Sequence, residues 1–228
     1  MSCVVTIEGR QFHITGEDAE KVADSYKLVE YLTKLDRRLD VSEVQVIWHT
    51  SKPDGDLLFA LIKVISILPN GKPVVGNLVL LSGNSTAVLN VYIDEYGDKW
   101  GLTVVQPRIA VGLLQCEELP AGMDDGGNPA AVAIREMLEE TDQSIKAMPL
   151  ILLGTFAPSP GLRGELVSLF AVEHKLTRAE ILALANKSTG IASEGEYIQT
   201  RISRLDDILE RTLDSKAIIA IMRYQSRK

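Results

Sequence analysis

The chain of 228 residues is long enough for one large domain, or for one domain with a smaller appendage. Its apolar share of 46% and charged share of 24% are ordinary for globular proteins, which argues against wholesale disorder. The formal net charge of −7 argues against a surface for nucleic acid or anionic membrane spread over the whole fold. A local cationic pocket for a small phosphorylated ligand remains compatible with this charge.

Cysteine usage and hydropathy indicate the compartment. Two cysteines, Cys3 and Cys116, cannot form a disulfide framework, so we expect a reducing compartment. The first ten residues lack a basic segment followed by a long apolar core, which argues against a secretory signal. No apolar run reaches the roughly 20 residues that a membrane-spanning helix needs. We therefore expect a soluble, cytoplasmic protein, with import into an organelle left open.

The first 70 residues combine strand and helix patterns. Alternating apolar residues predict a short strand pair at 4–6 and 11–14, joined by a turn. Apolar residues at helical spacing predict one amphipathic helix over 18–39. Two aliphatic runs, 41–48 and 57–68, predict two further strands. We expect residues 1–70 to form a small N-terminal α/β extension that takes part in dimerisation.

The remaining residues, 71–228, mix many strands with a few helices. A hairpin with an Asn-Gly turn at 70–71 leads into the first of these strands. The predicted strands cover 74–81, 87–93, 100–107, 113–119, 150–157 and 166–173, and the predicted helices cover 129–141, 177–185 and 205–221. This mixture predicts an α+β or layered α/β/α domain.

One of the predicted helices carries three carboxylates on a single face. Asn128 is a favourable N-cap and Pro129 fits the first helical position, so the helix should begin there. Glu136, Glu139 and Glu140 stand at i, i+3 and i+4, where like charges cost about 0.2–0.5 kcal/mol per pair. A divalent cation would relieve this repulsion, and oxygen ligands select hard ions such as Mg²⁺ or Mn²⁺. The alternative is a solvated acidic face.

The segment Arg135-Glu-Met-Leu-Glu-Glu140, after Glu118-Leu-Pro-Ala-Gly122, resembles the Nudix box. In that superfamily the Arg-Glu-U-x-Glu-Glu helix, with U apolar, binds the metals that activate a diphosphate. The spacing from Gly122 to Arg135 is one residue shorter than the family pattern, and the early Glu of the box has no counterpart. Asp142 stands in place of the closing Gly, although Asp can also adopt the left-handed conformation that ends a helix. Neither departure removes an implied metal ligand.

The resemblance implies a Nudix fold, in which a mixed β-sheet is layered between helices. It also implies Mg²⁺ as the cofactor, with Mn²⁺ possible, and it places Arg135 and Glu136 among the catalytic residues. The metal ligands that it implies are the Ala121 carbonyl and the carboxylates of Glu136, Glu139 and Glu140.

Two further stretches resemble the branch of ADP-ribose and ADP-sugar diphosphatases. Gln106-Pro-Arg108 matches a Gln-x-Arg whose arginine contacts substrate phosphate. The loop Ser159-Pro-Gly-Leu-Arg-Gly-Glu165 resembles one whose Glu positions or deprotonates the attacking water, with Arg163 as a second substrate contact. The alternatives are that Arg108 pairs with surface acids and that Glu165 is a loop carboxylate with no partner.

Two shorter stretches match the same branch in kind and order. They are residues 195–198, where Glu196 is more often structural than catalytic, and residues 214–217 at the end of the last predicted helix.

The resemblance implies Mg²⁺-dependent hydrolysis of a nucleoside-diphosphate sugar to a nucleoside monophosphate and a sugar phosphate. ADP-sugar and ADP-ribose are the favoured substrates. The alternatives are another nucleoside diphosphate derivative, such as a UDP-sugar or a dinucleotide, and a catalytically weak Nudix-fold module that binds nucleotides. A homodimer is expected, with no nucleic-acid or membrane partner. The motifs leave the base, the sugar and the number of metal ions open.

Overall fold

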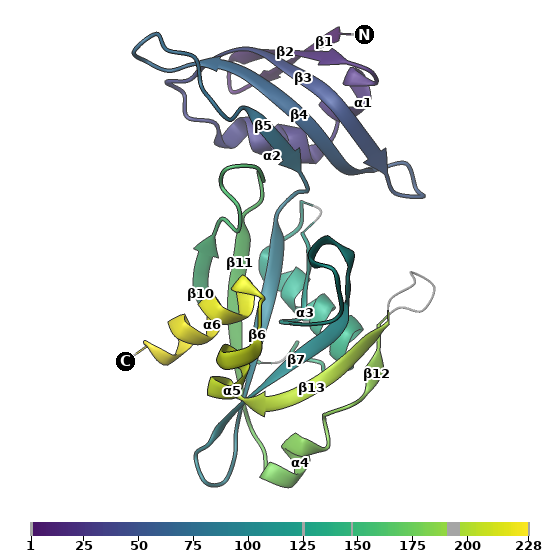
Figure 1. Cartoon of the computed structure of the whole chain (residues 1–228), viewed down its shortest axis with the longest axis vertical. Coiled ribbons are helices and arrows are strands. Elements are labelled where there is room, and N and C mark those ends of the chain that lie inside the picture. Colours follow the sequence, from purple (N-terminus) through teal and green to yellow (C-terminus); the bar gives the residue numbers. More distant parts are fainter. Residues whose placement is uncertain (1, 125, 147, 191–196, 228) are drawn as a thin grey trace. The chain divides into compact units, whose positions relative to one another are not determined.

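The computed structural model describes residues 2–124, 126–146, 148–190 and 197–227 (Figure 1). The chain divides into two compact units. The first contains Met1–Asn84 and Ala157–Leu166, and the second contains Ser85–Phe156 and Val167–Lys228. The division lies further along the chain than the predicted boundary after residue 70, because strand β5 (Leu78–Leu81) pairs with β4 (Leu57–Ile67) of the first unit.

The first unit is a five-stranded mixed sheet with helices on one face (Figure 1). The strand order is β1-β2-β3-β4-β5; the β2–β3 pair is parallel and the other pairs are antiparallel. The elements not yet bounded are β1 (Ser2–Ile7), β2 (Arg10–Gly16), α1 (Ala19–Ala23), α2 (Tyr26–Lys34) and β3 (Asp40–Ser51).

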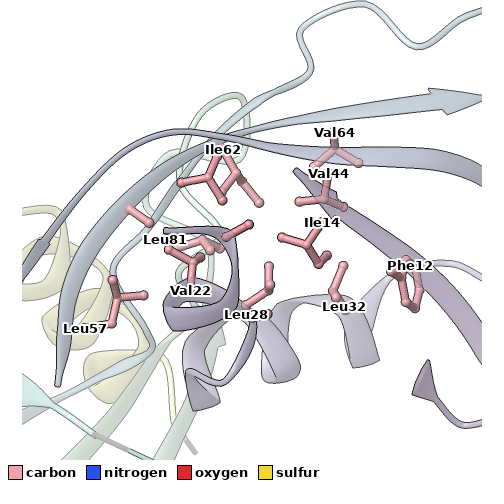
Figure 2. Packing of buried hydrophobic residues seen from close by; sticks show 14 residues of the cluster. Phe12, Ile14, Val22, Leu28, Leu32, Val44, Leu57, Ile62, Val64 and Leu81 are labelled. Atoms are coloured by element: carbon pink, nitrogen blue, oxygen red, sulfur yellow. The ribbon is translucent and has the colours of Figure 1, made fainter. Parts of the chain in front are cut away.

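Alternation along the strands builds the core of the first unit (Figure 2). Val44 of β3 and Ile62 of β4 point to the same face of the sheet as Ile14 of β2, and all three are fully buried. Leu28 and Leu32 of α2 pack against this face. Burial of each such side chain contributes about 1.5–3 kcal/mol, which explains why the apolar face determines the strand register.

The single helix predicted over 18–39 is in fact two helices, so this prediction is wrong. Ser25 separates them because its backbone is extended and its hydroxyl caps both sides. The hydroxyl accepts a hydrogen bond from the Leu28 amide and donates one to the Val22 carbonyl. Side-chain capping of this kind competes with helix continuation.

The second unit contains an eight-stranded mixed sheet. Six strands follow the order β10-β11-β6-β7-β13-β12, while β8 pairs with β7 and β9 pairs with β6. The strands are β6 (Ser85–Ile93), β7 (Lys99–Arg108), β8 (Leu113–Glu118), β9 (Ala121–Met123), β10 (Ile151–Phe156), β11 (Val167–Lys175), β12 (Ser188–Thr189) and β13 (Ile198–Arg204). The helices are the 3₁₀ turn η1 (Ile109–Val111), α3 (Pro129–Thr141), α4 (Arg178–Leu182), α5 (Leu205–Arg211) and α6 (Ser215–Gln225).

Helices cover both faces of this sheet (Figure 1). Val88 of β6 packs with Met137 of α3, whereas its neighbour Leu89 packs with Ile208 of α5 and Ile221 of α6. Successive residues of a strand point to opposite faces, so α3 lies on one side and α5 and α6 lie on the other. The predicted α+β architecture, with a mixed sheet layered between helices, is therefore confirmed.

The prediction of one continuous helix over 205–221 is wrong. The segment is divided into α5 and α6, and Asp214 is the N-cap of α6 rather than part of a helix end. Its carboxylate accepts the backbone N–H of Lys216 at 3.0 Å. The apolar periodicity continues across this break, whereas the cap depends on one side chain.

The state of the two cysteines and the length and hydropathy of the helices relate to the expected compartment. Cys3 and Cys116 are both thiols. Within the described ranges, none of the helices has the length and apolar character needed to cross a membrane.

Candidate active site

Helix α3 begins and ends as its sequence predicts. Asn128 accepts the Ala130 amide at 2.8 Å, and Pro129 occupies the first helical position, where its missing N–H costs nothing. Asp142 ends the helix in the left-handed conformation, with φ 56°. The carboxylates near the end of this helix are thus held on a well-defined element.

Glu140 lies against strand β9. Its side chain is buried, and its Oε2 accepts the backbone N–H of Ala121 at 3.0 Å. The main-chain carbonyl of Glu140 accepts the hydroxyl of Thr189 in β12 at 2.6 Å. The structure therefore brings Glu140 together with Ala121, two of the residues that the Nudix resemblance implies as metal ligands.

Glu136 lies against the same strand, one residue further along. Its carboxylate is buried and occupies the space where a Cβ atom on Gly122 would be, so a larger residue at position 122 would displace the Glu136 carboxylate. Arg135 donates to Glu136 Oε1 at 2.6 Å and to the Met123 carbonyl at 3.2 Å. Arg135 therefore fixes the Glu136 carboxylate against β9.

Glu139 is half-exposed, and its Oε2 lies 3.9 Å from Nε of Arg135. In the described part of the chain, no three side chains of His, Cys, Asp or Glu are gathered in an arrangement that could hold a metal ion. The donor types nevertheless fit a hard divalent cation, because two buried carboxylates converge on one three-residue strand. Glu139 would have to rotate to join them.

Asn90, Tyr92 and His174 form a row of polar and aromatic side chains on the sheet face that packs against α3. The Asn90 amide lies 2.8 Å from the Met137 sulfur, and its carbonyl oxygen lies 3.0 Å from Nε2 of His174. The His174 ring stacks on Tyr92 at 4.6 Å between centroids, and burial lowers the pKa of His174. His174 therefore stabilises the sheet surface on which α3 lies.

Arg108, the expected phosphate contact, lies at the end of β7 and pairs with Glu118 at the end of β8. Its Nε donates to Glu118 Oε1 at 2.6 Å and its Nη2 to Oε2 at 3.3 Å. Burial lowers the pKa of Arg108, but the hydrogen bond and charge of Glu118, together with the charge of Glu140, raise it overall. Arg108 therefore does pair with an acid, but this acid is buried, and Arg108 also interacts electrostatically with Glu140 of α3.

Sequence reasoning missed the rest of this ion pair. The ammonium of Lys216 lies 3.3 Å from Glu118 Oε2 and 2.9 Å from Asp214 Oδ1, and Asp214 Oδ2 accepts the Leu119 amide at 3.0 Å. Burial raises the pKa of Glu118, but Arg108 and Lys216 outweigh it, so the pKa is lowered. The resemblance at residues 214–217 was the available signal, although it named no role.

A second buried ion network, also missed, fixes the other side of β8. Glu117 accepts hydrogen bonds from Thr103 at 2.7 Å, from Arg201 at 2.8 Å and from Arg211 at 2.6 Å and 2.8 Å. These partners belong to β7, β13 and α5. Because neighbouring strand residues point to opposite faces, Glu117 holds β8 in the fold while Glu118 faces Arg108.

The Glu117 network should stabilise the fold in a pH-dependent way. Glu117→Gln should lower the free energy of unfolding at pH 7 by about 1–3 kcal/mol, because three donors lose a charged acceptor. Burial raises the pKa of Glu117, but hydrogen bonds from Arg211, Thr103 and Arg201 lower it overall. Its stabilisation is therefore present above the unfolded pKa and is lost as the pH falls below about 4.

Urea unfolding at pH 7 and pH 3.5 measures this effect, with exposed Glu210→Gln as the control. The difference between the two variants should be largest at pH 7 and should shrink at the lower pH. Equal unfolding free energies of Glu117→Gln and Glu210→Gln at pH 7 would show that the network contributes nothing to stability.

The expected catalytic loop belongs to the first unit. Arg163 lies 2.8 Å from Oε2 of the buried Glu165, so the alternative of a loop carboxylate without a partner is wrong. The loop is joined to β5 by hydrogen bonds between Leu80 and both Leu162 and Gly164. Glu165 and Arg163 are described in one unit and the α3 glutamates in the other, so their joint action stays a prediction. Glu196 lies outside the described residues.

No protein-family model matches the chain. A curated protein, "Nudix hydrolase 14, chloroplastic" of Arabidopsis thaliana, is 30% identical to it over 162 residues. The chain is a homologue of a Nudix hydrolase. The match supports the Nudix resemblance at the level of the superfamily. It covers 66% of this chain and 52% of the relative, so the chain spans about half the length of the curated relative that it matches. The relative is designated chloroplastic, and the predicted cytoplasmic location of this chain stays a prediction.

Proposed function

We propose that the chain hydrolyses the diphosphate of a nucleoside-diphosphate sugar, with ADP-sugar and ADP-ribose favoured. The products are a nucleoside monophosphate and a sugar phosphate, and the cofactor is Mg²⁺, for which Mn²⁺ can substitute. The observation that carries the proposal is the burial of Glu136 and Glu140 against β9, at 9% and 6% exposure. Burial of a carboxylate is costly unless the group is paired and hydrogen-bonded or binds a cation. The Nudix relative supports the reaction class.

Glu136, Glu140 and the Ala121 carbonyl would hold the cation, and Glu139 would join them after rotation. When bound, the cation neutralises the negative charge of the diphosphate. Arg135 keeps the Glu136 carboxylate in place through its 2.6 Å hydrogen bond. Preorganised donors of this kind act without reorganisation during the reaction.

Arg108 and the loop around Glu165 are proposed to act on the substrate. The Arg108 side chain is 45% exposed, and its guanidinium suits bidentate binding of phosphate oxygens. Glu165 is proposed to position or deprotonate the attacking water, held by the 2.8 Å ion pair with Arg163. Arg163 is proposed as a second contact to the substrate.

A substrate panel with Mg²⁺ tests the proposal. ADP-ribose, ADP-glucose, UDP-glucose and a dinucleotide are each incubated with the protein, and phosphate is measured after a phosphatase is added. Monophosphate products release phosphate at that step, whereas the intact diphosphates do not. We expect the fastest release from an ADP-sugar. Faster release from UDP-glucose or the dinucleotide would support the alternative substrates, and binding without release would support a binding module.

The first unit supports the proposed homodimer. Helices α1 and α2 cover only one face of its sheet (Figure 1). The register places Trp48 opposite Leu61 on the other face, and Ile47 and Trp48 are 48% and 54% exposed. Exposed apolar side chains such as these are stabilised by burial against a second copy. We propose a symmetric dimer through this face.

Light scattering at micromolar concentration tests the dimer. We expect a mass of twice 25.0 kDa for the wild type, and a shift towards monomer for Trp48→Lys, because a charge would be buried in the interface. Leu182→Lys, at a similarly exposed site in α4, is the matched control and should stay dimeric. A fully active monomer of the wild type would contradict the proposal.

A further inference from the structure

Four side chains of alternating charge form one ion network behind the proposed phosphate contact. In order, they are Arg108 of β7, Glu118 of β8, Lys216 of α6 and Asp214, the N-cap of α6. Lys216 is 19% exposed and lies between two carboxylates that are more deeply buried. The formal charges of the four groups sum to zero.

Glu118 fixes the orientation of Arg108. The bidentate pair uses Nε and Nη2, which are two of the five N–H directions that a guanidinium offers. Towards the described residues, the other N–H groups of Arg108 make no hydrogen bond. A guanidinium held along one edge keeps the other edge available for a phosphate oxygen pair, with less side-chain entropy to lose on binding.

The charge of Glu118 has a second effect, which opposes binding. A carboxylate that interacts only with Arg108 would neutralise the cation that is meant to attract the substrate. Lys216 and Nη2 of Arg108 both donate hydrogen bonds to the same carboxylate oxygen, Oε2 of Glu118. Lys216 also neutralises Asp214, whose carboxylate otherwise adds a negative charge behind the site.

We propose that Lys216 is a positioning residue, which shares Glu118 with Arg108 and so keeps Arg108 both oriented and electrostatically available to the substrate diphosphate. This proposal rests on the proposed function. It explains why a lysine is buried beside two carboxylates next to the strand that bears Arg108. A role in folding alone would not affect substrate affinity separately from turnover.

Lys216→Met tests the proposal by leaving Glu118 and Asp214 with Arg108 alone. We expect the KM for ADP-ribose to rise about tenfold and kcat to stay within about twofold, because the lost attraction acts already on the bound substrate. Lys216→Arg should restore KM to within about threefold of wild type. Lys146→Met, at an exposed lysine, should change neither constant.

Calorimetric titration with ADP separates this proposal from the proposed function, because it needs no turnover. The Kd for ADP should rise about tenfold in Lys216→Met even if the substrate panel gives no release. If Lys216→Met does not fold, Asp214→Asn with Lys216→Gln removes one charge of each sign and keeps the N-cap oxygen; its ADP Kd should also rise. An unchanged Kd for ADP in the folded variant would overturn the proposal. So would a fall in kcat as large as the rise in KM, with neither restored by Lys216→Arg. A wild type that binds no ADP would also overturn it.

Discussion

Replacement of Gly122 by alanine should lower kcat by about 100-fold while leaving the fold nearly as stable as before. A Cβ atom at this position would overlap the carboxylate of Glu136, which must then leave its place on β9. The overlapping group is the far end of a flexible side chain, so rotation relieves the clash at little cost in stability. Steady-state kinetics and thermal unfolding, measured on the same preparation, test the prediction.

Gly127→Ala is the matched control for this change. A Cβ atom there would meet Asp124 O at 3.7 Å and Val132 Cγ2 at 3.8 Å, which are ordinary contacts. Both glycines lie between β8 and α3, yet only Gly122 faces a carboxylate of α3. Similar kinetics for the two variants would contradict the placement of Glu136 at the reactive site.

Glu140→Gln should lower kcat by about 100- to 1,000-fold, because a neutral amide cannot replace a carboxylate that holds a divalent cation. The fold should be retained, since the amide oxygen can still accept the Ala121 N–H that Glu140 accepts at 3.0 Å. In metal-free buffer the melting temperature should rise slightly. The substitution removes the repulsion with Glu136 four residues earlier and an anion near the helix C-terminus.

The exposed Glu210→Gln serves as the control for removal of one negative charge. Turnover is measured at rising Mg²⁺ concentration, so that weakened metal binding and lost chemistry can be distinguished. Near-normal turnover of Glu140→Gln at saturating Mg²⁺ would show that the metal assignment is wrong.

The sequence predicts those features that depend on neighbouring residues. Asn128 and Pro129 start α3, and Asp142 ends it, because caps and turns act within a few residues. The layered sheet also follows from periodicity and from the Nudix resemblance. By contrast, periodicity runs through Ser25 and Asp214, where single side chains divide the predicted helices.

Contacts between distant residues explain what the sequence could not predict at the site. Glu117 and Arg201 are 84 residues apart, and Glu118 and Lys216 are 98 apart, so no local pattern marks either pair. Arg108 was predicted on the resemblance, but its bidentate partner depends on how β7 and β8 pair. The position of Gly122 beneath Glu136 likewise follows only from the packing of α3 on β9.

Direct titration with Mn²⁺, followed by the paramagnetic resonance signal of the unbound ion, tests most directly whether the α3 carboxylates on β9 hold the cation. The wild type should bind Mn²⁺ in competition with Mg²⁺. Gly122→Ala should bind Mn²⁺ at least about tenfold more weakly, whereas Gly127→Ala should match the wild type. Equal Mn²⁺ affinity in the wild type and Gly122→Ala would contradict the placement of the metal at this site.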